Sequence, residues 1–173
     1  VIFFVRVILF IYLFYFHRMP NHLIFGLVET KAYQGDVTLN PFRFQNFGTN
    51  SISMLVNSKS YPAVRYQPDW ANNLFMREYR GFNDAIGVKF HNQGSIVTPE
   101  LFKDGFNLYA FDLTPDGCGN YHIHASDRGH MQLEIGFAAS TAKDITCIIY
   151  GSMNDEFQLD QDRMAYSSGT IAP

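Results

Sequence analysis

The chain has 173 residues, the size of one domain, and its composition is 47% hydrophobic and 17% charged. This apolar content excludes bulk disorder, because enough surface can be buried to offset the entropy of ordering the chain. The formal net charge of −3, from 13 basic and 16 acidic residues, gives no basic excess, so direct nucleic-acid binding is not expected. Cys118 and Cys147 are too few for a disulfide framework or a four-cysteine zinc site, and we expect buried thiols.

The first 16 residues, VIFFVRVILFIYLFYF, are apolar apart from Arg6 and two tyrosines. The run is short for a transmembrane helix, which needs roughly 20 apolar residues, and an arginine inside it is costly. It also lacks the basic n-region and the small-residue cleavage site of a signal peptide. Three interpretations compete: a non-native leader from translated non-coding or frame-shifted DNA, a membrane anchor, or a strand or helix of the core. We favour a non-native leader over residues 1–18, since such runs arise easily from T-rich DNA and the first residue is Val1.

Period-two alternation or β-branched character marks most of the chain beyond residue 20 as short strands. The expected strands are residues 23–29, 42–47, 51–56, 61–66, 105–113, 121–124, 129–137 and 144–153. Gly26 marks a bulge or a close approach of another segment, and Pro62 indicates a sheet edge or a strand start. Asn57-Ser58 and the sequence TPDG at residues 114–117 are turn signals.

One helix is expected over residues 73–83, where Leu74, Phe75, Tyr79 and Phe82 recur at three- and four-residue spacing. Residues 32–41 and 87–99 are expected to be loops. Strands that alternate with helices, as in a parallel sheet, are absent from the pattern. The sequence therefore predicts an all-β fold, an antiparallel jelly-roll sandwich with one short helix.

Only one sequence pattern suggests a metal site. Alternation along a strand would place the imidazoles of His122 and His124 on one face, and with His130 they form a three-histidine set suited to zinc or iron. Jelly-roll enzymes of the cupin type add a carboxylate soon after such a pair. Here Glu134 lies too far along the chain and Asp127 lies in an apparent turn. We therefore expect surface histidines, and no bound metal or other cofactor.

Signals for other chemistry are incomplete. Ser152 lies in YGSMN, which lacks the second glycine of a nucleophile elbow, and no sequence logic connects Cys118 to a histidine. Gly117 and Gly119 are not followed by the residues of a phosphate-binding loop. Four acidic residues near the C-terminus lack the glycine and closing glutamate of a calcium loop: Asp155, Glu156, Asp160 and Asp162. We expect no enzymatic activity.

Four segments in order carry a resemblance to one protein family. They are MPNHLIFGLVETKAYQGDVTLNPFRFQNF, YQPDWANNLFMREYRGF, FKDGFNLYAFDLTPDG and DRGHMQLEIGFAASTAKDITCIIYGSMNDEFQLDQDRMAY. Across residues 19–166 the chain resembles uncharacterised proteins widespread in animal genomes that are related to capsid proteins of Polinton (Maverick) elements and adintoviruses. The shared pattern is NPF before a period-two aromatic strand, then DG-x-x-L-x-x-FDLTPD, then G-x-x-x-L-E-x-x-F, and a final β run with an acidic, arginine-containing tail.

The resemblance implies a structural role in an assembly. Proteins of this family are longer and resemble double jelly-roll major capsid proteins, in which two eight-stranded sandwiches lie side by side and three subunits form a capsomer. It implies that residues 19–166 are the C-terminal jelly roll, followed by a tail over residues 167–173. Self-association into a trimeric, capsomer-like assembly would need the first jelly roll to be supplied. If the leader is non-native, the protein would be located in a virion-like particle or inside the cell. If the leader is a genuine anchor, the protein would be located at the membrane.

The resemblance also assigns structural roles to particular residues. They are Asn40, Pro41, Phe42, Asp112, Thr114, Pro115 and Arg163. Asn40 and Pro41 would set the turn that starts a strand. Asp112 and Thr114 would fix the FDLTPD corner by hydrogen bonds between side chain and backbone. Arg163 would pair with the acidic tail.

Overall fold

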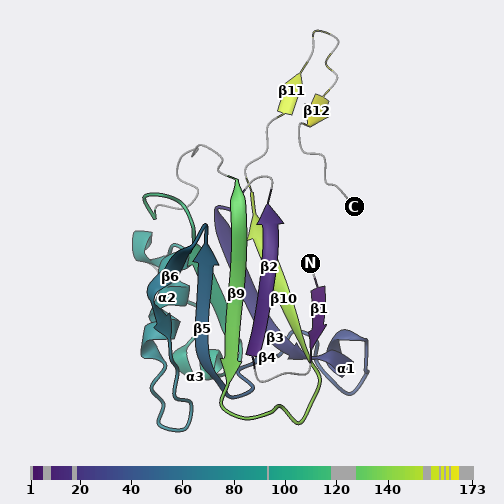
Figure 1. Cartoon of the computed structure of the whole chain (residues 1–173), viewed down its shortest axis with the longest axis vertical. Coiled ribbons are helices and arrows are strands. Elements are labelled where there is room, and N and C mark those ends of the chain that lie inside the picture. Colours follow the sequence, from purple (N-terminus) through teal and green to yellow (C-terminus); the bar gives the residue numbers. More distant parts are fainter. Residues whose placement is uncertain are drawn as a thin grey trace.

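The protein folds into a two-layered β-sandwich (Figure 1). The structure, a computed structural model, describes residues 2–5, 9–16, 19–92, 94–117, 128–153, 157–159, 161, 163 and 165–167. In Figure 1 the strands β2, β9 and β5 form the layer in front, with β3 and β10 behind them. The predicted all-β class is confirmed.

Two antiparallel sheets, named here the β3 sheet and the β9 sheet, make up the sandwich within the described residues. In spatial order the β3 sheet contains β1 (Ile2–Val5), β10 (Ile145–Ser152), β3 (His22–Glu29) and β8 (Leu108–Asp112). The β9 sheet contains β2 (Leu9–Phe16), β9 (Gly129–Phe137), β5 (Thr49–Val56) and β6 (Lys59–Tyr66). The chain crosses repeatedly from one sheet to the other, which is the strand order of a jelly roll.

Short elements complete the described fold. The strand β4 (Phe44–Gln45) pairs with β7 (Asp104–Gly105), and β11 (Phe157–Leu159) pairs with β12 (Ala165–Ser167). The helices are α1 (Thr30–Tyr33), α2 (Met76–Ala85), η1 (Val88–Phe90) and α3 (Pro99–Lys103). The helix expected at 73–83 corresponds to α2, while the other three lie in segments expected to be loops or strand ends. Three to five residues give too few turns for an apolar periodicity to be visible.

The apolar N-terminal run belongs to both sheets. Four residues of β1 pair antiparallel with β10, and all eight residues of β2 pair antiparallel with β9, from Leu9 opposite Gly136 to Phe16 opposite Gly129. The sandwich therefore includes strands that precede residue 19, at residues 2–5 and 9–16. Aromatic and β-branched residues favour this conformation. Among the described residues, no helix is both long and apolar enough to cross a membrane.

The core lies between the sheets and follows the predicted alternation. On β9, Met131, Leu133, Ile135 and Phe137 are buried, and their polar neighbours face outward. The β3 sheet contributes Leu23, Phe25, Leu27, Tyr109 and Phe111 from the opposite side. The Phe25 ring stacks on that of Tyr109 at a centroid distance of 5.2 Å. Burying each such side chain contributes about 1.5–3 kcal/mol.

Two turns that the sequence predicted have the expected geometry. Asn57 and Ser58 have φ values of 47° and 68°, and Val56 pairs with Lys59, so they form a two-residue hairpin between β5 and β6. Both central residues of such a turn need positive φ, which asparagine tolerates well. At residues 114–117 the Gly117 N–H donates to the Thr114 carbonyl at 3.2 Å.

Helix α2 closes one edge of the sandwich, next to β6 and β8. The Arg77 guanidinium donates to the carbonyl oxygens of Val64, at 2.5 Å, and Arg65, at 3.0 Å. It also lies 5.1 Å from the centroid of the Tyr66 ring, a cation–π distance. These contacts occupy carbonyl groups of the edge strand β6 that another strand would otherwise need.

The thiol of Cys147 provides a test of this packing. It lies on β10, opposite Phe3 of β1 on one side and Leu27 of β3 on the other, and its residue is only 1% exposed. Burial raises the pKa of this thiol to about 12, so it stays protonated at neutral and mildly alkaline pH. In a Cys118→Ser variant, we expect alkylation of the native protein to be roughly a thousandfold slower than in denaturing urea.

Deleting residues 1–8 removes β1 and should speed this alkylation, because the backbone edge of β10 next to Cys147 is then bare. The control is alkylation in denaturing urea. There, the Cys118→Ser protein should react at the same rate with and without residues 1–8. Rapid labelling of the intact native variant would contradict the described packing of β10.

Candidate interaction faces

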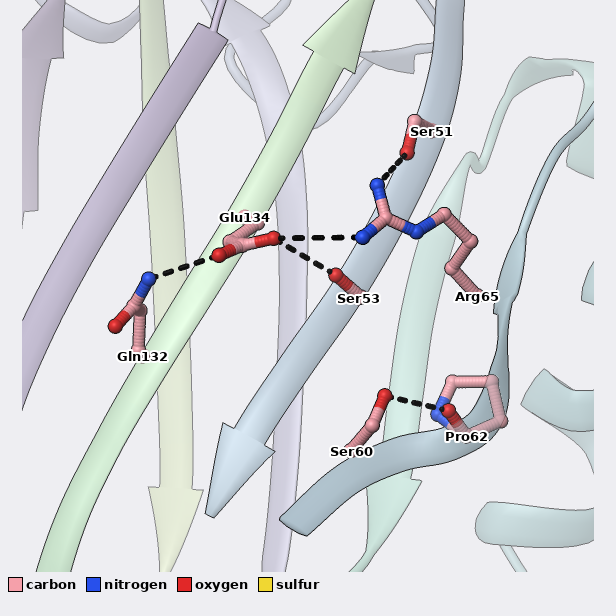
Figure 2. Close-up of polar contacts among 7 residues, drawn as sticks. All are labelled: Ser51, Ser53, Ser60, Pro62, Arg65, Gln132 and Glu134. Carbon is pink, nitrogen blue, oxygen red and sulfur yellow. Dashed lines mark hydrogen bonds and ion pairs between the residues drawn. The ribbon is translucent and has the colours of Figure 1, made fainter. Parts of the chain in front are cut away.

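On the outward side of the β9 sheet, polar side chains of β5, β6 and β9 are organised around Glu134 (Figure 2). Ser53 on β5 donates to Glu134 Oε2 at 3.2 Å, and Gln132 donates to Glu134 Oε1 at 2.8 Å. From β6, Arg65 places its guanidinium 4.0 Å from Glu134 Oε2 and donates to the Ser51 hydroxyl at 3.4 Å. Figure 2 shows these side chains reaching across three strands. The network links β5, β6 and β9 through contacts between their polar side chains.

The outward face of the β3 sheet is apolar instead. We name as the apolar face the residues Ile24, Gly26, Phe44, Leu108, Ile148 and Tyr150, which line a shallow hollow of about 230 Å³. The strand register places Ile24 beside Tyr150, and Gly26 between Ile148 and Leu108. Alternation explains the placement, since Leu23, Phe25 and Leu27 point into the core and the residues between them point outward.

Gly26 permits the close approach that builds this hollow. A Cβ atom at this position would lie 2.5 Å from Phe44 Cδ1 and 2.7 Å from Leu108 Cδ2. Only glycine lets the Phe44 ring lie so near the strand, and the predicted close approach at Gly26 is confirmed. At one end of the face, α1 covers the sheet, and the buried hydroxyls of Thr30 and Thr146 hydrogen bond at 2.9 Å.

A second hollow, of about 270 Å³, lies between α1, the loop after it and β4. Polar and charged residues line much of it: Glu29, Thr38, Asn40, Arg43, Gln45 and Lys143. Its two cations are already engaged, Lys143 with Glu29 at 2.6 Å and Arg43 with Asp104 at 3.0 Å. Both basic side chains are more than half exposed, so these pairs stabilise the fold only weakly.

Several of the residues assigned structural roles make local hydrogen bonds. Asn40 Oδ1 accepts from the Phe42 N–H at 2.9 Å, in the turn that also holds Pro41, and β4 begins at Phe44. Asp112 Oδ1 accepts from the Thr114 N–H at 3.0 Å and also from the Thr114 hydroxyl. Pro115 lies in the turn that follows. These contacts terminate β8 and start β4, and they involve no reactive group.

Other candidates lie partly outside the described residues. His122, His124, Cys118 and Asp127 are outside them, as are the acidic residues 155, 156, 160 and 162, so the pairing expected for Arg163 stays a prediction. His130 is exposed on the polar face, where its backbone N–H donates to Asn57 Oδ1 at 3.0 Å. Within the part of the chain that the structure describes, no three His, Cys, Asp or Glu residues are grouped as metal ligands would be.

Comparison with known proteins gives one distant relative. No protein-family profile and no solved structure matches the chain. It is similar to an uncharacterised protein of Caenorhabditis elegans, with 24% identity over 146 residues. The match covers 83% of this chain and 35% of the nematode protein, so the chain spans about a third of its relative's length.

The Glu134 network predicts a non-additive effect on stability. Ser53 is only 3% exposed, so Glu134→Ala leaves a buried hydroxyl without its acceptor and should lower the free energy of unfolding by about 1–3 kcal/mol. The double variant Ser53→Ala/Glu134→Ala should cost less than the sum of the single changes, because the unpaired hydroxyl is then absent. Urea denaturation of the four proteins measures this coupling.

Gln132→Ala is the matched control, since it removes the other hydrogen bond to Glu134 from a partly exposed side chain. Its cost should be within about 0.5 kcal/mol. Strict additivity of the Ser53 and Glu134 changes would show that the pair does not interact as described.

Proposed function

We propose that the chain is a capsid-like structural protein derived from an integrated viral or transposable element, and that it acts by packing against neighbouring subunits. The observation that carries the proposal is a jelly-roll strand order combined with an apolar outward face on one sheet. Jelly rolls recur in viral capsid proteins, and also in lectins and cupins. The choice among these classes therefore depends on where the molecule offers a binding surface.

The interior of the sandwich favours packing over ligand binding. A jelly roll that holds a small molecule or metal between its sheets needs polar groups that point inward. Most described inward positions of β3, β5 and β9 carry apolar, nearly inaccessible side chains, as Phe25, Met54 and Leu133 illustrate. The buried Thr49 on β5 is a polar exception, and its hydroxyl lies 3.5 Å from the Tyr109 hydroxyl. Among the described residues, the apolar hollow on the outside of the β3 sheet offers a surface that a partner could cover.

The finer proposal is that the chain is one half of a double jelly roll. The resemblance over residues 19–166 supports it, and so does the length of the nematode relative. The match takes up 35% of that protein, so the remainder has room for another domain of the same size. Three such subunits would then form a capsomer-like trimer, and we propose no catalytic role.

Two observations at the genomic locus and on its product test the proposal. We expect an adjacent reading frame that encodes a first jelly roll, together with genes typical of large DNA transposons. The combined product, purified and studied by analytical ultracentrifugation and electron microscopy, should form trimers with a pseudo-hexagonal outline.

A combined product that stays monomeric at every concentration would contradict the proposal. So would a purified protein that retains a stoichiometric metal ion by elemental analysis, because that result would favour a metal-binding jelly roll instead.

A further inference from the structure

We propose that residues 129–136 of β9 and 145–148 of β10 form a strand-accepting site, which holds an extended, uncharged, apolar segment by β-strand addition even when that segment is a separate polypeptide. In the structure, β1 and β2 of the chain's own N-terminal run occupy this site. The inference goes beyond the proposed assembly function and does not depend on it. The strand order, the register, the burial of the accepting strands and the charges along them support it.

The strands β1 and β2 lie at the outer ends of their sheets. In spatial order β1 precedes β10, β3 and β8 in one sheet, and β2 precedes β9, β5 and β6 in the other. Figure 1 shows both strands on the side of the sandwich away from α2. Within the described residues, removal of both would leave three contiguous strands in each sheet. The ladders of those remaining strands do not pass through β1 or β2.

The two ladders at the strand-accepting site are regular. All eight residues of β2 pair with β9, and all four residues of β1 pair with β10, each antiparallel and without a register shift. In β-strand addition the backbone hydrogen bonds supply the affinity, and side chains at alternate positions set the specificity. Because β1 and β2 join different sheets, the site fits a partner that offers one strand to each sheet.

The accepting strands carry core side chains. Met131, Leu133 and Ile135 of β9 are fully buried, as is Ile145 of β10, and Cys147 is nearly so. Among the described residues, β1 and β2 are the strands that cover this side of β9 and β10. An apolar segment at the site keeps these core residues out of water, whereas a polar segment would bring water to them.

The charges along β9 favour an uncharged partner. Glu134 accepts a hydrogen bond from Ser53 on β5 and lies 4.0 Å from the Arg65 guanidinium on β6. Its carboxylate therefore needs no basic group from the opposite side. The register places Ile11 of β2 directly opposite Glu134, where an acidic residue would be repelled.

The other end of the β9 sheet is less suited to strand addition. There the Arg77 guanidinium donates to the carbonyl oxygens of Val64 and Arg65 on β6, and Pro62 on the same strand has no N–H to donate. The β2 sequence, LFIYLFYF, has no proline, glycine or charged residue. The two ends of the sheet therefore differ, and we expect strand addition at the β9 edge.

Cleavage of the folded full chain tests the inference. In a Cys118→Ser variant, a specific protease site is inserted between Arg18 and Met19, and the chain is cut after it has folded. Residues 1–18 should stay bound to the remainder through gel filtration in native buffer. The alkylation rate of Cys147 should stay within about twofold of that of the uncut variant, which is the control for folding.

A second variant adds Leu13→Pro and Phe14→Pro to the same chain. Successive N–H groups of a strand point in opposite directions, so one of the two prolines removes a ladder hydrogen bond to β9. After cutting, retention of residues 1–18 should fall at least about tenfold relative to the variant without prolines. The uncut proline variant, whose segment is still tethered, shows whether the remainder folds.

Release of residues 1–18 from the variant without prolines overturns the inference, whether the remainder then precipitates or stays in solution, because the site then fails to hold a separate polypeptide. Equal retention of the segment with the two prolines also overturns it, since that result would show apolar adhesion without a ladder. Retention that the prolines abolish supports the inference, and it does so whether or not the combined product forms trimers.

Discussion

The structure depends on the burial of alternate side chains from two sheets against each other. Leu23, Phe25 and Leu27 of β3 face Met131, Leu133 and Ile135 of β9 across one apolar layer. Because the side-chain period of a strand is two, this burial fixes the register of every paired strand and decides which residues face outward. The polar network at Glu134 and the apolar hollow at Gly26 are both consequences of that register.

The outward sides of the two sheets differ in the polarity of their described side chains. On the β9 sheet, the Ser53 hydroxyl donates to Glu134 and the Arg65 guanidinium lies 4.0 Å from the same carboxylate, so these polar groups of β5, β6 and β9 have partners within the sheet. On the β3 sheet, Phe44 is packed against Gly26, and apart from the Tyr150 hydroxyl the side chains that line the hollow offer no hydrogen bonds to water. A polar surface whose groups are hydrogen bonded gains little from association, whereas an apolar surface gains free energy when another surface covers it.

Local patterns in the sequence predicted much of this fold. The runs that became β5, β8 and β9 alternate, the run that became β10 is β-branched, and Asn57-Ser58 has the chemistry of a two-residue hairpin. The pairing of β1 and β2 was not predicted, because an apolar run carries no signal for which strand it will join. Helix α3 was missed although Thr98 caps it and Pro99 follows, a signature at its start that periodicity does not detect. The hollow joins residues as distant as Phe44 and Tyr150, so only the three-dimensional register reveals it.

The position of Arg77 limits how such a sheet can grow. By donating to the carbonyls of Val64 and Arg65, its guanidinium removes acceptors that an incoming strand would use on the β6 side. The strand β2 lies at the other end of this sheet, far from Arg77. Edge-to-edge pairing of another strand along this part of β6 is thereby disfavoured.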